Sequence, residues 1–556
     1  MSQQLRKIKI KLGIDFGTKY CLIGIYNQQT QNIELYHEQI PSCIWFQNGL
    51  SHGPVVIGQP AYDSLSSNRI VDIKKVIGRA KNEIMKSDRE NWEYTISEEN
   101  GFIYISLKDE ETGEIKKIHV ETIISLMFSH IIDSFLKTKG GREQFEIEEV
   151  VVPVPVDFND KQMKVIEQSL KKVIGINSVY FISEPTVALH AFQHEYANEI
   201  QENDGILVID FGGGTLDFSF CQYRNKRLRA KHIAGDQNLG GLNFDTVMRK
   251  MIIDNLNAND YCKFVMKNQG GGETRAHKNK RIQLSIQIMK EAEKAKIELS
   301  SKKYYTIEAK TFFREEEIEK NEIEDILITR EDFEEECSEL YQRFEELLQE
   351  TITIQKERTI TKVILIGGSC SLPKVQEIVE NNIGDKNKII KKDFNPLTAV
   401  CKGAVLTANR EENGIEQEPI NTISKALGIE TAGGRIIKFA YDGDSLPITN
   451  TIRVQTVYDY QKTLPFFICR GPDEYVRYTT KRLTKLTIED IPLMKQEDSD
   501  IEIRTTVNRN GMIEISAVFI GTNFQKELTT VLDLDAQSEI FESIREEYEK
   551  YCDIFF

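Results

Sequence analysis

The sequence lacks the features that would place it in a membrane or in an oxidising compartment. No stretch approaches the roughly 20 consecutive apolar residues that a membrane-spanning helix needs. The N-terminal MSQQLRK contains no apolar core of a signal peptide. The nine cysteines are scattered and form no CxxC pair, which favours buried, reduced thiols over a disulfide framework or a zinc site. We therefore expect a cytoplasmic location, or an organelle of the same redox state, and no membrane partner.

The chain is also short of basic residues. Lysine and arginine number 71 against 87 acidic residues, which gives a net charge of −16. This balance argues against nonspecific nucleic-acid binding, although a nucleotide needs only local donors. With 556 residues the chain is too long for one core, so we expect about three domains.

One pattern occurs twice. Gly13–Thr18 (GIDFGT) closes an apolar strand, and Ile209–Thr215 (IDFGGGT) does the same further along the chain. Each is followed by a second apolar strand, at Cys21–Tyr26 and at Leu216–Cys221, so each predicts a β-hairpin with Asp, Gly and Thr at its turn. Two such hairpins facing each other can hold a polyphosphate and its metal between them.

The residue types in these turns suit phosphate and magnesium. Backbone N–H groups of a tight turn form an anion cradle, and glycine lets the backbone approach the phosphates. A carboxylate at the strand end can face hydrated Mg²⁺. Gly367-Gly368-Ser369, before Pro373 at the start of a predicted helix, is a third turn of this kind. Taken singly, the first and third turns could equally be an ordinary hairpin and strand–helix turn, whereas three consecutive glycines in the second favour a ligand.

The remaining pattern divides the chain. Residues 1–410 alternate strands with helices, which predicts an α/β domain with helices at 159–170, 283–299 and 332–351 and a loop at 268–280. The pattern lapses at 411–422, which we interpret as a linker. Residues 423–534 have a period of two, with strands at 453–457 and 502–507, and 508–511 is a turn between two strands of this kind, so this segment predicts an antiparallel β domain. Residues 535–556 predict one short helix.

The hairpins and the Gly-Gly turn resemble the sugar-kinase/actin/heat-shock ATPase superfamily, and within it the chain resembles 70-kDa heat-shock-type chaperones. The matching segments are IGR at 77–79, VPVDFND at 154–160, ISEPT at 182–186, AGDQNLGG at 234–241 and LGIETAGG at 427–434. The resemblance runs in order from about residue 8 to 534. It implies an actin-like ATPase domain with two lobes and a duplicated core, followed by an antiparallel β-sandwich that binds peptide. We expect the helical lid of the family to be absent here.

The resemblance also implies roles for individual residues. Lys74 matches the catalytic lysine that orients the attacking water, and Thr18, Thr215, Glu184 and Asp210 match residues around the γ-phosphate and water. Asp15 and Asp210 match carboxylates that hold Mg²⁺ through water, and Pro155 matches a proline that relays nucleotide state. The implied contacts with ATP or ADP are Asp15, Gly17, Thr18, Lys19, Tyr20, Gly212, Gly213, Gly214, Thr215, Gly240, Glu293, Lys296, Ser300, Gly367, Gly368 and Ser369.

The chain departs from the family at several positions. Ile297 and Ser371 stand where two arginines sandwich the adenine, so we expect weaker and less base-selective nucleotide binding. Met163 replaces an arginine that acts with Pro155, and Asp157 replaces an aromatic residue. Pro419 in the linker lacks the N–H that a docked strand would donate. Phe466 and Phe467 fall near the client pocket and would fill it.

Two hypotheses of different classes follow. The first is an ATP-binding heat-shock-type chaperone or co-chaperone with slow hydrolysis to ADP and phosphate and weakened interdomain coupling. Its implied partners are a J-domain protein, a nucleotide-exchange factor and unfolded peptide, the last opposed by the altered pocket and missing lid. The second is a nucleotide-bound scaffold subunit of a larger protein assembly. A small-molecule kinase of the same superfamily is the least supported, because the β domain matches chaperones.

Overall fold

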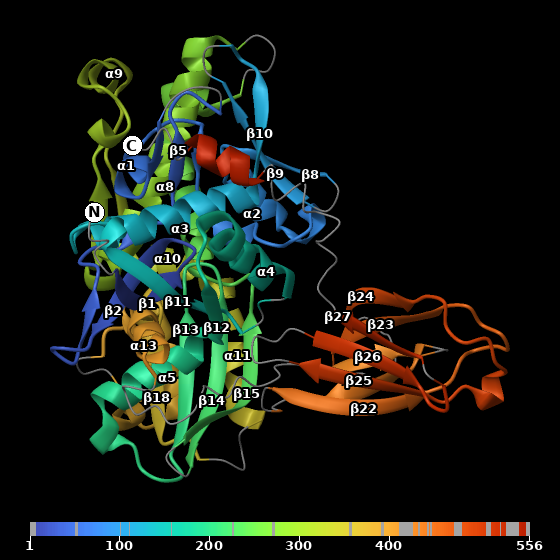
Figure 1. Ribbon diagram of the computed structural model, residues 1–556. Helices are drawn as coiled ribbons and strands as arrows, with labels where there is room; N and C mark the ends of the chain where they lie inside the picture. The colour runs from blue at the N-terminus through green and yellow to red at the C-terminus, as the bar shows by residue number, and fades with distance from the viewer. Residues whose placement is uncertain are drawn as a thin grey trace, which may run out of the picture.

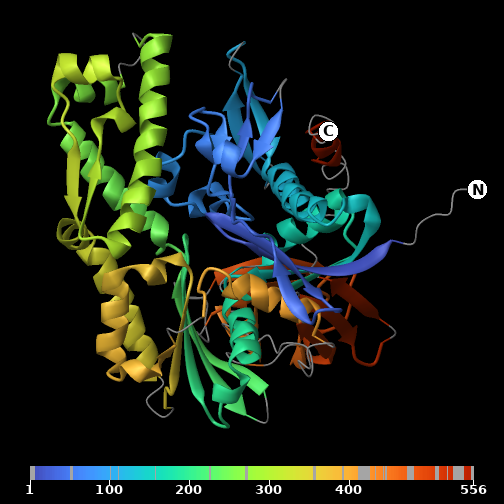
Figure 2. The same ribbon diagram turned by 90° about the vertical axis from the view of Figure 1, so that its left-hand side faces the viewer.

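The computed structural model is shown in two views in Figures 1 and 2. It describes residues 7–50, 54–99, 102–109, 112–156, 158, 160–224, 227–268, 273–354, 359–390, 394–410, 426–431, 434–441, 444, 447–471, 481–507, 513–522, 524–529 and 544–551. The predicted linker at 411–422, the turn at 508–511, Asp157, the predicted helix start at Asn159 and most of 535–556 lie outside the described residues.

The first large sheet contains the first of the two hairpins. Its strand order is β12-β11-β1-β2-β3, and the short β4 pairs with β2. The antiparallel hairpin consists of β1 (Ile8–Phe16) and β2 (Tyr20–Asn27), as the sequence predicts. On the far side of β1 lie the parallel strands β11 and β12. The other bounds are β3 (Asn32–Leu35), β4 (Ile40–Pro41), β11 (Phe145–Val154) and β12 (Ser178–Ser183).

The second large sheet repeats this topology. Its order is β15-β14-β13-β18-β19, with β13 (Gly205–Phe211) and β14 (Leu216–Arg224) as the antiparallel hairpin. Strand β15 extends the antiparallel side, whereas β18 and β19 are parallel to β13. Their bounds are β15 (Arg227–Asp236), β18 (Lys362–Ile366) and β19 (Ile389–Ile390). The repeated sequence pattern therefore corresponds to a repeated order and direction of strands.

Two helices, α5 (Glu184–Glu195) and α13 (Ala399–Ala408), join the sheets. Val151 of the first sheet and Val208 of the second belong to one buried cluster with Val187 of α5 and Ala404 of α13. The helices touch through backbone: a Cβ on Gly403 would collide with Val187. The two hairpins are thus held against one shared core.

Each sheet carries a lobe of further elements (Figure 2). The first lobe adds α1 (Gln59–Asp63), α2 (Lys86–Glu90), α3 (Val120–Lys137), α4 (Asp160–Gln168) and strands β5 (Ile44–Phe46), β6 (Val55–Ile57), β7 (Arg69–Ile70), β8 (Thr95–Glu99), β9 (Phe102–Lys108) and β10 (Ile115–His119). The second lobe adds α6 (Gly241–Leu256), α7 (Asp260–Met266), α8 (Arg275–Ser301), α9 (Glu315–Asn321), α10 (Arg330–Glu336), α11 (Ser338–Ile354), α12 (Pro373–Ile383) and the hairpin β16 (Tyr304–Ile307) and β17 (Ile326–Thr329).

The C-terminal part contains two antiparallel four-stranded sheets packed face to face, which lie to one side of the lobes in Figure 1. One has the order β21-β20-β23-β24 and the other β22-β25-β26-β27, with a common apolar core between them. The bounds are β20 (Leu427–Glu430), β21 (Ile436–Ala440), β22 (Ile448–Val454), β23 (Leu464–Arg470), β24 (Lys481–Ile488), β25 (Ile501–Val507), β26 (Ile513–Phe519) and β27 (Gln525–Thr529). The chain is therefore mixed α/β, and the proposed boundaries at 410, 422 and 534 stay predictions.

Three element predictions need correction. Helix α8 begins at Arg275, inside the loop predicted at 268–280, because the Thr274 side chain accepts a hydrogen bond from the His277 N–H and caps it. The exposed first turns of α8 carry no apolar stripe, so the hydrophobic pattern of the sequence did not indicate a helix there. The single helix predicted at 332–351 is broken at Cys337, which is buried and has a non-helical backbone. Strand β22 ends at Val454, short of the predicted 457.

Of the helices within the described residues, none has both the length and the apolar content that a membrane span requires.

Residues 544–551 form a helix that lies beside α3 in both views. Ile544, Tyr548 and Tyr551 enter the core of the first lobe. The Tyr548 hydroxyl donates to Ser129 Oγ at 2.8 Å, and Thr122 donates to the Glu547 carboxylate at 2.5 Å. This C-terminal helix is therefore fixed to the first lobe by both apolar packing and hydrogen bonds.

The C-terminal helix should bind the first lobe more tightly in acid. Burial raises the pKa of Glu547 from 4.5 to about 7, and repulsion from Glu547 contributes to a similar rise at Glu121. Because the docked state holds the proton more tightly, docking is strongest below pH 4.5 and weakens as the pH rises through about 7. We expect the protection of residues 544–551 from hydrogen exchange to fall roughly tenfold between pH 5.5 and 7.5.

Glu547→Gln should remove much of this pH dependence and raise protection at pH 7.5. The exposed Glu549→Gln, on the same helix, is the matched control. Equal pH profiles for the two variants would contradict a role for the buried carboxyl group.

Candidate functional site

The candidate site lies where the turns of the two hairpins meet. In the first turn, a Cβ on Gly17 would collide with the carbonyl oxygen of Tyr20, so only glycine fits. The Ser42 hydroxyl donates to the Gly17 carbonyl oxygen at 2.7 Å and fixes this turn from outside. In the second turn, the Gly212 N–H donates to the Thr215 carbonyl oxygen at 3.0 Å. Both turns are tight and expose backbone.

The two turns contact each other across the lobes. A Cβ on Gly214 would lie 2.8 Å from Thr18 Oγ1, and one on Gly213 would lie 3.0 Å from Lys19 Cγ. Behind them, a Cβ on Gly240 would lie 2.6 Å from the Gly213 carbonyl oxygen. The structure therefore brings Gly17, Thr18, Lys19, Gly213, Gly214 and Gly240 together, with Thr215 at the end of the second turn.

A group of carboxylates surrounds one lysine beside these turns. Lys74 Nζ donates to Glu184 Oε1 at 2.8 Å, and both side chains are buried. Although burial opposes the charged form, Glu184, Asp15 and Asp210 together raise the pKa of Lys74. Phe158 covers the amine, which lies 5.9 Å from the ring centroid. Lys74 is therefore a positively charged group held in place on several sides.

The carboxylates outnumber this lysine. Burial, followed by repulsion from Glu184, raises the pKa of Asp15 to about 7. Burial and repulsion from Glu184, Asp217 and Asp15 raise the pKa of Asp210 well above its ordinary value. Asp210 Oδ2 is buried and has no hydrogen-bond partner among the described residues. This excess of negative charge around an orphaned oxygen is an environment that a cation would stabilise.

The donor set fits a hydrated divalent cation better than a directly bound one. Within the described part of the chain, no three His, Cys, Asp or Glu side chains converge closely enough to hold a metal ion. Mg²⁺ keeps several of its waters and uses one or two carboxylates together with phosphate oxygens. Asp15 and Asp210 could hold such an ion through water, and the N–H groups of the two turns could face phosphate oxygens.

A second polar network crosses from the first lobe to α6 and α8. Tyr20 donates to Glu293 Oε1 at 3.2 Å, and Tyr62 donates to Glu293 Oε2 at 2.9 Å. Lys19 Nζ lies 3.5 Å from the same carboxylate and 3.7 Å from Asp245. Lys296 forms an ion pair with Asp245 at 2.6 Å. The predicted residues Lys19, Tyr20, Glu293 and Lys296 thus lie in one network that bridges the lobes.

The third turn is joined to the second. Gly367 has a φ of +83° and lies against the backbone of Phe211, so a side chain would be strained there and would collide. The Ser369 hydroxyl donates to the Gly212 carbonyl oxygen at 2.8 Å. Gly368 is exposed and unconstrained, and the Ser300 hydroxyl donates to the Lys296 carbonyl oxygen in its own helix. Gly368 and Ser300 therefore border the site without contributing to its bonding.

Sequence reasoning missed Asp245, Asp217 and Phe158 as site residues. Asp245 is fully buried between Lys19 and Lys296, on the face of α6 that also buries Leu242 and Met248. An acid on an apolar helical face was the signal that could have identified it. The signal for Asp217 and Phe158 in the sequence was weaker. Asp217 matters through its repulsion of Asp210, and Phe158 through its contact with Lys74, and neither contact can be recognised from the sequence pattern.

The structure also shows the surroundings of the positions at which the sequence departs from the family it resembles. Ile297 is 56% exposed and Ser371 is also exposed, so neither offers a cation to a base. In the β-sandwich, Phe466 is buried in the core and Phe467 lies under Arg482, whose Cζ is 4.7 Å from the ring centroid. Both phenylalanines are therefore already in contact with protein groups.

Comparison with known proteins gives a consistent result. The family model described as "Hsp70 protein" matches residues 11–553. A "Heat shock 70 kDa protein" of Emericella nidulans is 26% identical over 97% of this chain and 81% of that protein. The "Stromal 70 kDa heat shock-related protein, chloroplastic" of Pisum sativum is 28% identical over 94% and 71%, respectively. The "Chaperone protein dnaK" of Trieres chinensis is 26% identical over 98% and 86%.

The contact between the turns can be tested by adding one methyl group. Gly214→Ala would place its Cβ 2.8 Å from Thr18 Oγ1 and 3.1 Å from Lys75 Cε, so we expect the free energy of unfolding to fall by about 1–3 kcal/mol. Gly212→Ala is the matched control, because its Cβ would meet only the Thr215 carbonyl oxygen at 3.8 Å. Urea unfolding of the nucleotide-free protein measures both. Equal losses for the two variants would show that the turns do not touch.

Proposed function

This chain belongs to the Hsp70 family, and we propose that it is an ATP-binding chaperone or co-chaperone that hydrolyses ATP slowly. Members of the family bind ATP or ADP with Mg²⁺. The observation that carries the proposal is the contact of two glycine-rich turns beside Lys74 and an excess of carboxylates. Protein backbone and charge there suit a nucleotide polyphosphate with its metal.

Each residue of the site would have its own role in hydrolysis. Mg²⁺ would neutralise phosphate charge, and Asp15 and Asp210 would hold its water shell. Lys74, oriented by Glu184 at 2.8 Å, would position the attacking water and stabilise negative charge on the γ-phosphate. The Thr18 and Thr215 hydroxyls would bond the phosphoryl oxygens. The missing contacts with adenine should weaken ATP binding without altering these roles.

We expect the chaperone activity of this protein to be weaker than that of the family it belongs to. Phe466 and Phe467 fill space in the β-sandwich, and Met163 packs against the core of the first lobe where the family has its relay arginine. Weak peptide capture and weak coupling to ATP follow, since Met163 cannot form the charge-assisted bonds of a guanidinium. J-domain proteins, nucleotide-exchange factors and unfolded peptides are the partners to test, and a cytoplasmic location is part of the proposal.

The second candidate is a nucleotide-bound scaffold in a larger assembly. The network around Glu293 favours it, because Tyr20, Tyr62 and Lys19 already tie the lobes together through the protein's own side chains. A nucleotide held in such a site would act as a structural ligand without a cycle of opening and closing.

Replacing the lysine should separate binding from turnover. We expect Lys74→Ala to lower single-turnover ATP hydrolysis by about 10²-fold or more, because the γ-phosphate loses its positioned cation. ADP binding, measured by calorimetry, should stay within about threefold and confirms folding. Lys171→Ala, a surface lysine paired with Glu167, is the control.

Single-turnover rates with a J-domain protein and an unfolded peptide distinguish the two candidates. Stimulation by either supports a working chaperone, whereas bound nucleotide with no turnover supports the scaffold. Absence of any nucleotide binding would contradict both.

Restoring an arginine at one of the two positions that face adenine in the family should strengthen ATP binding. We expect Ile297→Arg to raise ATP affinity by about 2- to 30-fold, since a cation–π contact is worth about 0.5–2 kcal/mol. Isothermal titration with ATP and GTP measures both affinity and base selectivity. Leu327→Arg, at another exposed apolar position, controls for added charge. Tight, adenine-selective binding by the unaltered protein would contradict the expected weak grip on the base.

A further inference from the structure

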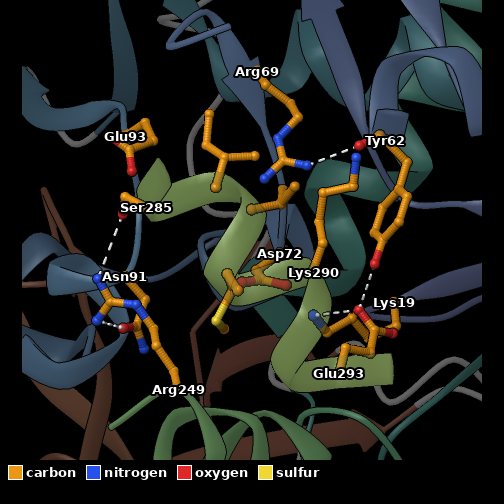
Figure 3. Close-up of a pocket in the computed structure, with 13 residues that line it drawn as sticks. Lys19, Tyr62, Arg69, Asp72, Asn91, Glu93, Arg249, Ser285, Lys290 and Glu293 are labelled. Atoms are coloured by element: carbon orange, nitrogen blue, oxygen red, sulfur yellow. Dashed lines mark hydrogen bonds and ion pairs between the residues drawn. The ribbon is translucent and has the colours of Figure 1, made fainter. Parts of the chain in front are cut away.

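A cavity lies between the lobes beside Glu293 (Figure 3), and Lys19 of the first hairpin turn contributes to its lining. Its first-lobe wall comes from α1, β7 and the segment around Asn91, and its second-lobe wall comes from α6 and α8. Four of the lining side chains are cationic and three are acidic. The residues that line it are Lys19, Tyr62, Arg69, Val71, Asp72, Asn91, Glu93, Arg249, Ser285, Ile286, Met289, Lys290 and Glu293.

Two of the arginines have only neutral acceptors among the described residues. Arg69 is 7% exposed and donates to the Tyr62 carbonyl oxygen at 2.9 Å. Arg249 makes two long contacts of 3.4 Å, to Asn91 Oδ1 and Ser285 Oγ. A guanidinium has five N–H donors, and leaving a buried one without a carboxylate or phosphate is costly.

Lys290 adds a third cation to the same space. Its amine donates to the Asp63 carbonyl oxygen at 3.1 Å and lies 4.0 Å from the Asp63 carboxylate, at the limit of an ion pair. Burial, followed by repulsion from Arg69, lowers the pKa of Lys290, and burial lowers the pKa of Arg249. Both cations would be stabilised by an anion between them.

Two of the three acids of the cavity have other hydrogen-bond partners, whereas Glu93 interacts electrostatically with both Arg249 and Arg69. Glu293 accepts from Tyr20 and Tyr62 and lies near Lys19. Asp72 accepts from Trp92 Nε1 at 3.2 Å, on the wall of the first lobe. Burial raises the pKa of Glu93, although Ser285 and Arg249 oppose the rise, so this carboxyl group accepts a proton more readily than usual. None of the three forms a close ion pair with Arg69 or Arg249 in the described structure.

We propose that this cavity binds a phosphoryl group through Arg69, Arg249 and Lys290. Planar guanidinium groups bind tetrahedral oxyanions through paired N–H donors, and a lysine adds a point charge. In Figure 3, Arg69 and Lys290 point inward beside Tyr62, and Arg249 lies on the opposite side. Cationic side chains thus reach the space from both lobes, so an anion bound between them would also hold the lobes together.

The phosphoryl group has two possible sources with the same chemistry. One is free inorganic phosphate. The other is a phosphate ester on the ribose of a nucleotide, because Glu293, a predicted nucleoside contact, lies on the shared wall between the cavity and the candidate nucleotide site. The second source rests on the proposed nucleotide binding, whereas the first does not.

Two calorimetric titrations of the full chain test the proposal. In the first, inorganic phosphate is added to protein with and without saturating ADP and Mg²⁺. In the second, adenosine 3′-phosphate 5′-diphosphate is compared with ADP. We expect phosphate to bind in the presence of ADP, or the ribose ester to bind at least about tenfold more tightly than ADP. Arg249→Met should reduce the positive signal at least about tenfold.

Further variants distinguish loss of the anion site from loss of folding. Lys290→Met, at the same cavity, should also weaken binding, and Lys290→Arg should restore it. Arg453→Met, an exposed arginine of the β-sandwich, should leave it unchanged. If neither titration gives a signal that depends on Arg249 and Lys290, the proposal is wrong. If ADP does not bind but phosphate binds in an Arg249-dependent way, the anion site stands and the proposed nucleotide function fails.

Discussion

The close approach of two glycine-rich turns is the constraint on which the site depends. Thr18 of the first hairpin touches the backbone of Gly214 in the second, and Gly240 supports that backbone from behind. A side chain at Gly214 would press on Thr18 Oγ1 of the first hairpin, and one at Gly240 would collide with the backbone of Gly213 and Gly214. Because the carboxylates Asp15 and Asp210 end the strands that lead into these turns, their proximity follows from the same contact. The buried like charges are a cost of this geometry, and Lys74 offsets part of it.

The polar network around Glu293 and Asp245 gives the lobes a second connection, made by side chains rather than by backbone. Lysines approach Asp245 from both lobes, and tyrosines from the first lobe donate to Glu293 in the second. Its strength therefore depends on the protonation and solvation of a few groups, whereas the contact between the turns depends on shape. Family resemblance suggests a grip on the base by arginines, yet here the polar contacts of α8 are made by Glu293 and Lys296, whereas Ile297 is exposed and apolar.

Much of the fold could be predicted from the sequence because the two hairpins are local. Each consists of adjacent apolar strands around a Gly-rich turn, so β1–β2 and β13–β14 follow from neighbouring residues. The start of α8 could not be predicted, since its first turns are solvated and carry no apolar stripe. Within the site, Lys74 was found by resemblance and the glycines by pattern. Asp245 was missed because its role depends on an interaction with Lys19, which is far away in the sequence.

Helix α13 has a consequence for how the chain folds. It lies against Gly13 of β1, almost four hundred residues away along the chain, and packs on α5 through Gly403. The first sheet is therefore covered on that face only after nearly the whole of both lobes has been synthesised. Contacts of such long sequence separation slow folding, and the uncovered strand remains exposed in the meantime. Until α13 has been synthesised, a growing chain of this protein therefore exposes the face of β1 that α13 covers in the folded structure.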